Sequence, residues 1–126
     1  MRSQLLLGAL SFFIMSSVHA QTLICPKAAQ IDQVSTESGT YVFTAPASKG
    51  TTWMGTGAEE FDLKTASFTG AKIDDPVLTC DYKDQSDRTM QLTLKEAKKA
   101  RPVAKGNWKE NQCSSEKLTL CAFNIQ

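Results

Sequence analysis

Residues 77–95 read VLTCDYKDQSDRTMQLTLK, and this stretch decides the fold class. On both sides of its polar centre, residues 84–87, every second residue is apolar. Such period-two alternation places one face of a strand on a core and the other face in water. The polar centre is rich in residues that form turns. The stretch therefore predicts two antiparallel strands joined by a turn, with these side chains facing a core: Leu78, Cys80, Tyr82, Met90, Leu92 and Leu94.

Turn-forming residues recur along the rest of the chain about every eight to twelve positions, a spacing typical of many short strands. Residues 41–44 are rich in β-forming side chains, and residues 118–125 alternate again, with Cys121, Phe123 and Ile125 on one face. The chain is therefore predicted to be all-β, a small antiparallel β-sandwich or barrel with meander or Greek-key connections.

Two segments allow more than one local structure. Residues 94–100 have good helix propensity, but the segment is short and ends before Pro102. A strand that runs on into a helical turn or a loop is equally consistent with it. Residues 25–30, which begin at the first cysteine, can form a single helical turn.

Residues 1–20 have the parts of a secretory signal peptide in the expected order. Arg2 supplies a positive charge, residues 5–15 (LLLGALSFFIM) are apolar, and Val18 and Ala20 occupy the −3 and −1 positions of a cleavage site. As a helix, the apolar run would span only about half of a bilayer core, so we expect no stable membrane anchor. Cleavage after Ala20 would leave a single β-rich domain, residues 21–126, in a protein that is secreted or periplasmic.

A lipoprotein is the alternative product of export, with the lipid attached to Cys25. Because the bulky Ile24 just before this cysteine is a poor context for lipid attachment, we favour the exported protein without a lipid. Cleavage after Ala20 also removes His19, the only histidine of the chain.

The mature chain has almost no net charge, because removing Arg2 leaves 13 basic and 13 acidic side chains. This balance calls for neither a nucleic acid nor a membrane partner. The charges are unevenly spread, however: acidic residues dominate residues 56–87, and basic residues dominate residues 88–117.

Four cysteines in a small exported domain indicate two disulfides. Three connectivities are possible, and the sequence alone does not choose among them. We expect Cys25–Cys80, which would tie the N-terminus to an interior strand, and Cys113–Cys121, which would close one loop or hairpin. A metal site on these cysteines is disfavoured, since there is no CxxC pair and no histidine in the mature chain.

The loss of histidine and of free thiols removes the commonest general base and nucleophile, so we expect no enzyme and no cofactor. Carboxylate chemistry survives as an option, because two of the residues Glu59, Glu60 and Asp62 can supply a pair of carboxylates at the separation that glycosidases use. A solvated strand edge or turn is the simpler interpretation of these acids. Ser48 and Lys49 precede Gly50 and are expected in a surface loop rather than in a catalytic dyad.

A second group of acids raises the question of calcium. Asp81, Asp84 and Asp87 lie at intervals of three, and Asp74 and Asp75 are adjacent. Loop carboxylates suit a hard cation, but this spacing does not match the EF-hand pattern. An ordinary polar turn beside a hairpin explains the same residues, and we predict no metal.

The best candidate for recognition is a run of basic residues between positions 95 and 109, which we call the basic run. Trp108 lies within it and would stack on a sugar or anchor a protein partner. An anionic glycan, a phospholipid head group or an acidic protein surface would suit such a patch. A solvated face, with Trp108 in the core under a long loop, is the alternative interpretation. The candidate binding residues are Lys98, Lys99, Arg101, Lys105 and Trp108, flanked by Lys95 and Lys109.

Cysteines and aromatic residues form a pattern along nearly the whole mature chain. It comprises Cys25-Pro26, Ile31, Gly39-x-Tyr41, Trp53, Phe61, Phe68, Cys80-x-Tyr82, Trp108, Cys113 and Cys121-x-Phe123. The pattern resembles a family of small exported proteins from Gram-negative bacteria that is known as a domain of unknown function. Such families often carry a proline after the last cysteine, where this chain has Ala122. The resemblance implies an exported, disulfide-bonded, β-rich domain and transfers no catalytic residues.

These observations favour an exported, monomeric, non-enzymatic binding module that contacts a glycan, a lipid head group or a protein. The alternative is an inhibitor of a hydrolase such as a lysozyme or a protease, which would present the acidic loop 84–87 to a basic enzyme. A hydrolase that depends on carboxylates is the third hypothesis.

Overall fold

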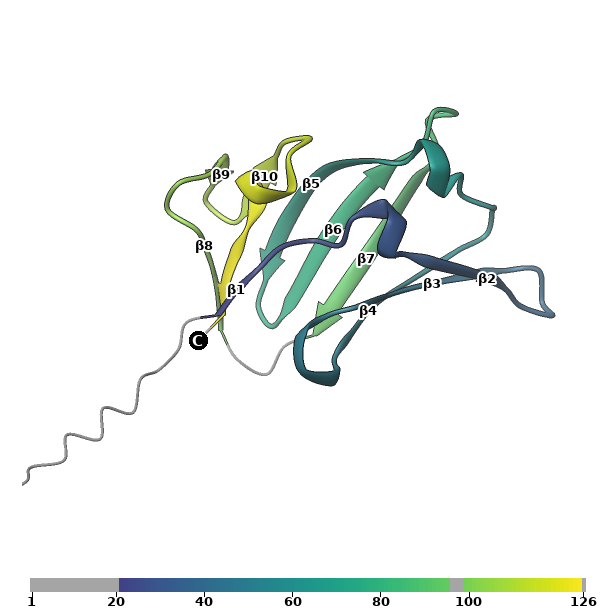
Figure 1. The fold of residues 1–126 in the computed structure, drawn as a ribbon, viewed down its shortest axis with the longest axis horizontal. Coiled ribbons are helices and arrows are strands. Elements are labelled where there is room, and N and C mark those ends of the chain that lie inside the picture. The colour runs from purple at the N-terminus through teal and green to yellow at the C-terminus, as the bar shows by residue number, and fades with distance from the viewer. Residues whose placement is uncertain (1–20, 96–98, 126) are drawn as a thin grey trace, which may run out of the picture.

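The computed structural model describes residues 21–95 and 99–125, and within them the chain is all-β, with two antiparallel sheets and no α-helix (Figure 1). The prediction of an all-β fold with two disulfides is therefore confirmed. The predicted signal peptide, residues 1–20, and Lys98 of the basic run lie outside the described residues.

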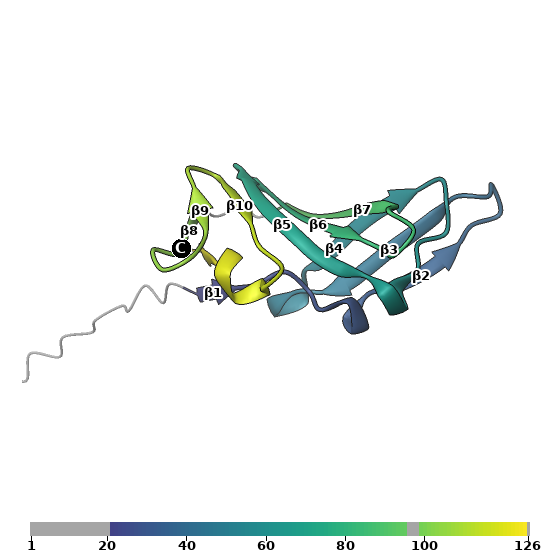
Figure 2. The ribbon, with the colours of Figure 1, turned by 90° about the horizontal axis from the view of Figure 1, so that it is seen from above.

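Eight strands form the larger sheet, which is strongly curved (Figure 2). Every neighbouring pair is antiparallel. In spatial order the strands are β2 (Asp32–Ser35), β3 (Tyr41–Pro46), β4 (Thr52–Gly57), β7 (Thr89–Lys95), β6 (Val77–Lys83), β5 (Ser67–Asp74), β10 (Gln112–Ser114) and β9 (Trp108–Lys109).

Three short strands form the smaller sheet, in the order β1 (Gln21–Leu23), β11 (Phe123–Ile125) and β8 (Ala100–Pro102). Gln21 pairs with Ile125, so the first and last described strands lie side by side. Four short 3-10 turns connect the strands: η1 (Ala28–Gln30), η2 (Ser48–Gly50), η3 (Leu63–Thr65) and η4 (Leu118–Cys121). In the described part of the chain, no helix is long and apolar enough to cross a membrane.

The predicted hairpin of residues 77–95 is present as β6 and β7. Cys80 pairs with Leu92 and Tyr82 with Met90, and the apolar face of both strands is buried. Asp84 N–H donates to Arg88 O and closes the turn between the two strands. Alternation along the sequence was sufficient here because β7 buries one face only and β6 does so at every residue except Thr79.

Aromatic side chains join the two sheets. Phe123 of β11 lies with its ring centroid 6.3 Å from that of Trp53 on β4 and 5.4 Å from that of Trp108 on β9. Trp53 and Phe123 are both fully buried. The smaller sheet therefore packs against the buried face of the larger one, as in a β-sandwich.

Both expected disulfides are present, Cys25–Cys80 and Cys113–Cys121. Near the first, the buried Tyr82 hydroxyl donates to Pro26 O. Burial, and secondly the Asp81 carboxylate, raise the pKa of Tyr82 far above its ordinary value, so this hydroxyl keeps the proton that it donates. The disulfide and this hydrogen bond together attach the N-terminal segment to β6.

One strand prediction was wrong in part. Residues 118–125 were expected to form a continuous strand, but only Phe123–Ile125 is extended, and Leu118–Cys121 forms the 3-10 turn η4. Cys121 must approach Cys113, eight residues earlier, to a Cα–Cα distance of 5.6 Å, which requires the chain to turn. Leu120 N–H donates to Lys117 O within this turn.

The two ambiguous segments have different outcomes. In residues 25–30, the expected helical turn is present as η1. In residues 94–100, β7 ends at Lys95 and β8 begins at Ala100, and the residues between Lys95 and Lys99 lie outside the described part.

Gly55 allows β4 to meet β7. A Cβ atom at Gly55 would lie 2.1 Å from Gln91 O, whereas a Cβ atom at Gly57 would lie 3.4 Å from its nearest neighbour, a ring carbon of Phe43.

We predict that Gly55→Ala lowers the free energy of unfolding by about 1–3 kcal/mol, since backbone must move to relieve the clash. Chemical denaturation measures the change. Gly57→Ala is the matched control and should change stability by less than about 1 kcal/mol; equal effects of the two variants would contradict the prediction.

Candidate functional site

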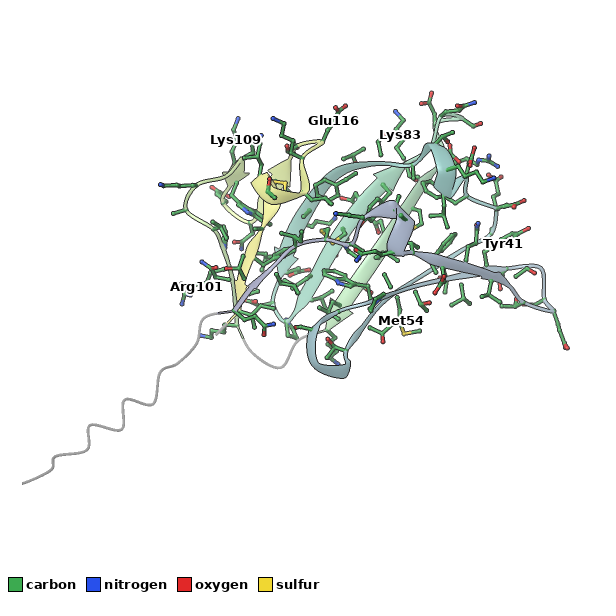
Figure 3. The ribbon with its side chains drawn as sticks, viewed as in Figure 1. Tyr41, Met54, Lys83, Arg101, Lys109 and Glu116 are labelled. Carbon is green, nitrogen blue, oxygen red and sulfur yellow. A yellow bond between two sulfur atoms is a disulfide. The ribbon has the colours of Figure 1, made fainter. Side chains whose placement is uncertain are left out.

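Basic side chains gather at the end of the molecule formed by β8, β9 and β10. Figure 3 shows Arg101 and Lys109 at this end and Tyr41 at the opposite end. Lys99, Arg101, Lys105 and Lys109 are all exposed, and we call these four residues the basic end. These four cations of the basic run are therefore accessible to solvent.

The β9–β10 hairpin shapes this end. Lys109 pairs with Gln112 and Trp108 with Cys113. The hairpin is continuous with the larger sheet through β5, where Gln112 pairs with Lys72. Glu110, in its turn, has a φ of 58°, in the left-handed region that a tight reversal requires. Short strands that are joined to a sheet hold the neighbouring side chains in fixed positions.

A hollow of about 470 Å³ opens at this hairpin. We call it the Trp108 hollow. Asn107 lies in its wall and donates through Nδ2 to Ser114 O at 3.2 Å, which connects the chain before β9 to β10. Amides, a hydroxyl and an ammonium group surround the space, and these groups can bind a polar ligand. The lining residues are Gly106, Asn107, Trp108, Lys109, Gln112 and Ser114.

Trp108 is also part of the edge of the core. Its Nε1 donates to Ala122 O at 2.9 Å, and its ring packs against Phe123. The residue is half-buried. Trp108 therefore has a fixed orientation in the wall of the hollow. A role in recognition and a role in packing are compatible for this residue.

A second hollow, of about 490 Å³, is lined by two further cations of the basic end. We call it the Arg101 hollow. Lys99 and Arg101 line it together with Asn111, whose carbonyl oxygen accepts a hydrogen bond from Ile73 N–H at 2.9 Å. Asp75 contributes one acidic group. Lys105 is exposed in the loop between β8 and β9 and lines neither hollow.

Of the predicted binding residues, Trp108 thus lines one hollow, and Lys99 and Arg101 line the other. The structure adds four polar residues that the sequence analysis missed, Asn107, Asn111, Gln112 and Ser114. Their polarity alone marks an ordinary loop. These four residues are candidates for binding only because the pairing of β10 with β9 and β5 brings them together.

The acidic residues considered for hydrolysis are divided between two hollows, and of the three only Glu60 lines both. Glu59 and Glu60 are exposed and line a hollow between β4 and β7. Asp62 instead accepts a hydrogen bond from Lys64 N–H and caps η3. Ser48 lies in η2, where its carbonyl oxygen accepts hydrogen bonds from Thr51.

The residues considered for calcium are separated as well. Asp84 is buried, Asp87 pairs with Lys83 at 3.3 Å, and one carboxylate oxygen of Asp81, Oδ1, is buried without a hydrogen-bond partner among the described residues. Within residues 21–95 and 99–125, no group of three or more His, Cys, Asp or Glu side chains has the arrangement of a metal site.

Asp84 organises the turn between β6 and β7. Its Oδ1 accepts from Ser86 N–H and Arg88 N–H, and its Oδ2 accepts from Asp62 N–H and from Arg88 Nε. Burial by itself raises the pKa of the Asp84 carboxyl, but these backbone donors and the Arg88 guanidinium outweigh it and hold that pKa below its ordinary value. The carboxylate is therefore a charged structural centre, with four donors for its two oxygens.

Comparison with known proteins identifies the family. The family model described as protein of unknown function DUF3757 matches residues 18–124. The chain belongs to this family. No curated protein and no solved structure matches the chain. Membership confirms the expectation of a domain of unknown function, and the family description names no organism, ligand or reaction.

Asp84→Asn tests the role of the buried carboxylate in this family member. A depressed pKa contributes stability that is present above the unfolded pKa, about 3.9, and is lost as the pH falls through the folded value. We predict that the variant has a clearly lower Tm than the wild type at pH 6. The difference in Tm should become steadily smaller below about pH 4. Thermal unfolding followed by circular dichroism measures both. Asp87→Asn, at the exposed end of the same turn, is the control. A Tm difference between Asp84→Asn and the wild type that does not depend on pH would contradict the role of the charged Asp84 carboxylate.

Proposed function

We propose that this protein is an exported, non-enzymatic binding module whose basic end binds an anionic glycan. In this proposal it is a Gram-negative bacterial protein, residues 1–20 are a signal peptide, and the mature chain acts in the periplasm or outside the cell as a monomer. Two disulfides support an oxidising compartment, because such bonds are rare in the cytosol.

The observation that carries the proposal is the combination of the Trp108 hollow and the Arg101 hollow at one end of the sheet. Asn107, Gln112 and Ser114 supply neutral hydrogen-bonding groups of the kind that bind sugar hydroxyls. Arg101 and Lys99 supply cations, and an arginine can bind a carboxylate or sulfate through two parallel hydrogen bonds. A sugar with acidic substituents needs both kinds of group close together.

A glycan suits this surface better than a membrane does. A protein that docks on lipid head groups usually inserts large apolar side chains beside its cations. The large hydrophobic residues exposed in the described part of the chain are Ile24, Val34 and Met54. None of these three lines the Trp108 hollow or the Arg101 hollow.

We predict that the mature, oxidised protein binds a trimer of galacturonic acid and not the neutral trimer maltotriose, as measured by isothermal titration calorimetry. The double variant Arg101→Gln/Lys109→Gln should weaken binding by about tenfold or more, because each cation can form a charge-assisted hydrogen bond. Affinity should also fall with added salt.

Lys27→Gln/Lys64→Gln is the matched control, since it removes two exposed cations elsewhere and should bind like the wild type. Binding of phosphatidylglycerol vesicles without binding of the acidic trimer would overturn the glycan proposal, as would equal affinities of the two double variants.

A second candidate function, inhibition of a hydrolase, is favoured by the rigidity of the turn 84–88. The buried Asp84 carboxylate accepts from Ser86 N–H and Arg88 N–H, and Asp87 N–H donates to Asp84 O at 3.0 Å. A pre-organised loop loses little conformational entropy when it enters a cleft. Asp87, at a φ of 62°, is the acidic residue that the turn leaves exposed.

If the protein is an inhibitor, it should reduce the activity of a basic hydrolase such as lysozyme at micromolar concentration. Asp87→Asn should weaken inhibition by about two- to tenfold, because it removes the exposed charge and asparagine tolerates the same backbone conformation. A panel of lysozymes and proteases with turbidity and peptide substrates measures this. Absence of inhibition across the panel would exclude the function.

A further inference from the structure

A third hollow, of about 400 Å³, lies between β4 and β7, on elements that do not form the basic end. We call it the β4–β7 hollow. The ladder between these strands consists of the pair Met54–Thr93, and Gly55 lies against Gln91 O. Beyond this contact, Gly57 and Thr89 both line the hollow. The hollow therefore opens where the pairing of the two strands has ended.

Arg88 is the fixed cation of this hollow. Its backbone N–H and its Nε both donate to the buried Asp84 carboxylate, at 3.0 Å each. Asp84 in turn is held by Asp62 N–H and Ser86 N–H, so the guanidinium is attached to a rigid turn. The Arg88 side chain remains 39% exposed, and no described residue accepts a hydrogen bond from its terminal Nη groups. These donors can bind a carboxylate of a ligand.

The rest of the hollow combines apolar and acidic groups. Phe43, Phe61 and Met90 line it from the core, and the first two rings are in edge-to-face contact with their centroids 6.2 Å apart. Three exposed acids, Glu59, Glu60 and Asp87, line it as well, and the Asp87 carboxylate already pairs with Lys83 at 3.3 Å. A ligand that places a carboxylate on Arg88 would thus have acidic residues near its other polar groups and the outer edge of the apolar core beneath it.

We propose that the β4–β7 hollow binds a short peptide with free amino and carboxyl termini and an apolar side chain. The carboxylate binds the free guanidinium nitrogens of Arg88, the ammonium group binds Glu59 or Glu60, and the apolar side chain packs on Phe43 and Met90. A simple anion would be repelled by the two glutamates, and a simple cation would be repelled by Arg88. A zwitterion complements both signs of charge.

This site is independent of the proposed glycan site. Among the residues that the structure describes, the β4–β7 hollow and the two hollows of the basic end share no lining residue. Loss of glycan binding would leave the peptide site intact, and loss of peptide binding would leave the glycan site intact.

The test uses the dipeptide Ala-Phe and two derivatives, N-acetyl-Ala-Phe and Ala-Phe amide, titrated into the isotopically labelled mature protein and followed by NMR. We expect Ala-Phe to shift the backbone amides of Gly57 and Thr89 and to bind about tenfold or more tightly than either derivative, since each derivative lacks one charged terminus.

Glu59→Gln/Glu60→Gln assigns the ammonium group. This double variant should weaken binding of Ala-Phe and should not weaken binding of the N-acetyl peptide, whose lone carboxylate is no longer repelled by the two glutamates. Both glutamates are exposed, so the variant should fold. Arg101→Gln/Lys109→Gln is the control and should bind Ala-Phe like the wild type. The proposal is overturned if Ala-Phe causes no shifts at 10 mM (about the weakest binding worth assigning), or if amidation of the carboxylate does not weaken binding.

Discussion

The Cys25–Cys80 disulfide is the constraint on which the rest of the structure depends. It attaches the segment before η1 to the centre of β6. Tyr82, on the same strand, donates a further hydrogen bond from its hydroxyl to Pro26 O. The N-terminal segment is thereby held against the buried face of the larger sheet, and β1 can pair with β11. A domain of this size buries a modest core, so a cross-link that contributes about 2–4 kcal/mol is a large share of its stability.

The same constraint positions the smaller sheet and, through it, the basic end. Pairing of β11 with β1 and β8 carries Phe123 onto Trp53 and Trp108. Trp108 then supports the wall of one hollow, and β8 carries Arg101 into the wall of the other. In the turn between β6 and β7, a different buried group has the equivalent role: the Asp84 carboxylate holds the turn that presents Arg88. Both candidate sites therefore lie on side chains whose supports are buried and hydrogen-bonded, as pre-organised binding sites require.

Much of the fold was predictable because its signals are local. Leu78, Cys80 and Tyr82 alternate with polar residues, and that alternation alone identified β6 and its buried face. The partial failure at residues 118–125 has the opposite cause. Cys121 and Phe123 alternate like strand residues, but the bond from Cys121 to Cys113 imposes a turn that no local pattern announces. The candidate site was predicted through its charged residues and missed in its neutral ones, since an isolated asparagine or glutamine is equally typical of any loop.

The sequence by itself determined the all-β class, the core face of the central hairpin and the presence of two disulfides, because periodicity and cysteine count are properties of the chain before it folds. Only the tertiary structure decided which polar groups share a hollow. Gln112 lies beside Lys109 through the pairing of β10 with β9, and Arg88 lines a hollow with Glu59 through the arrangement of β4 and β7. Such proximities depend on strand order and register. Pairing between residues far apart in the sequence determines both, so a local sequence pattern does not encode them.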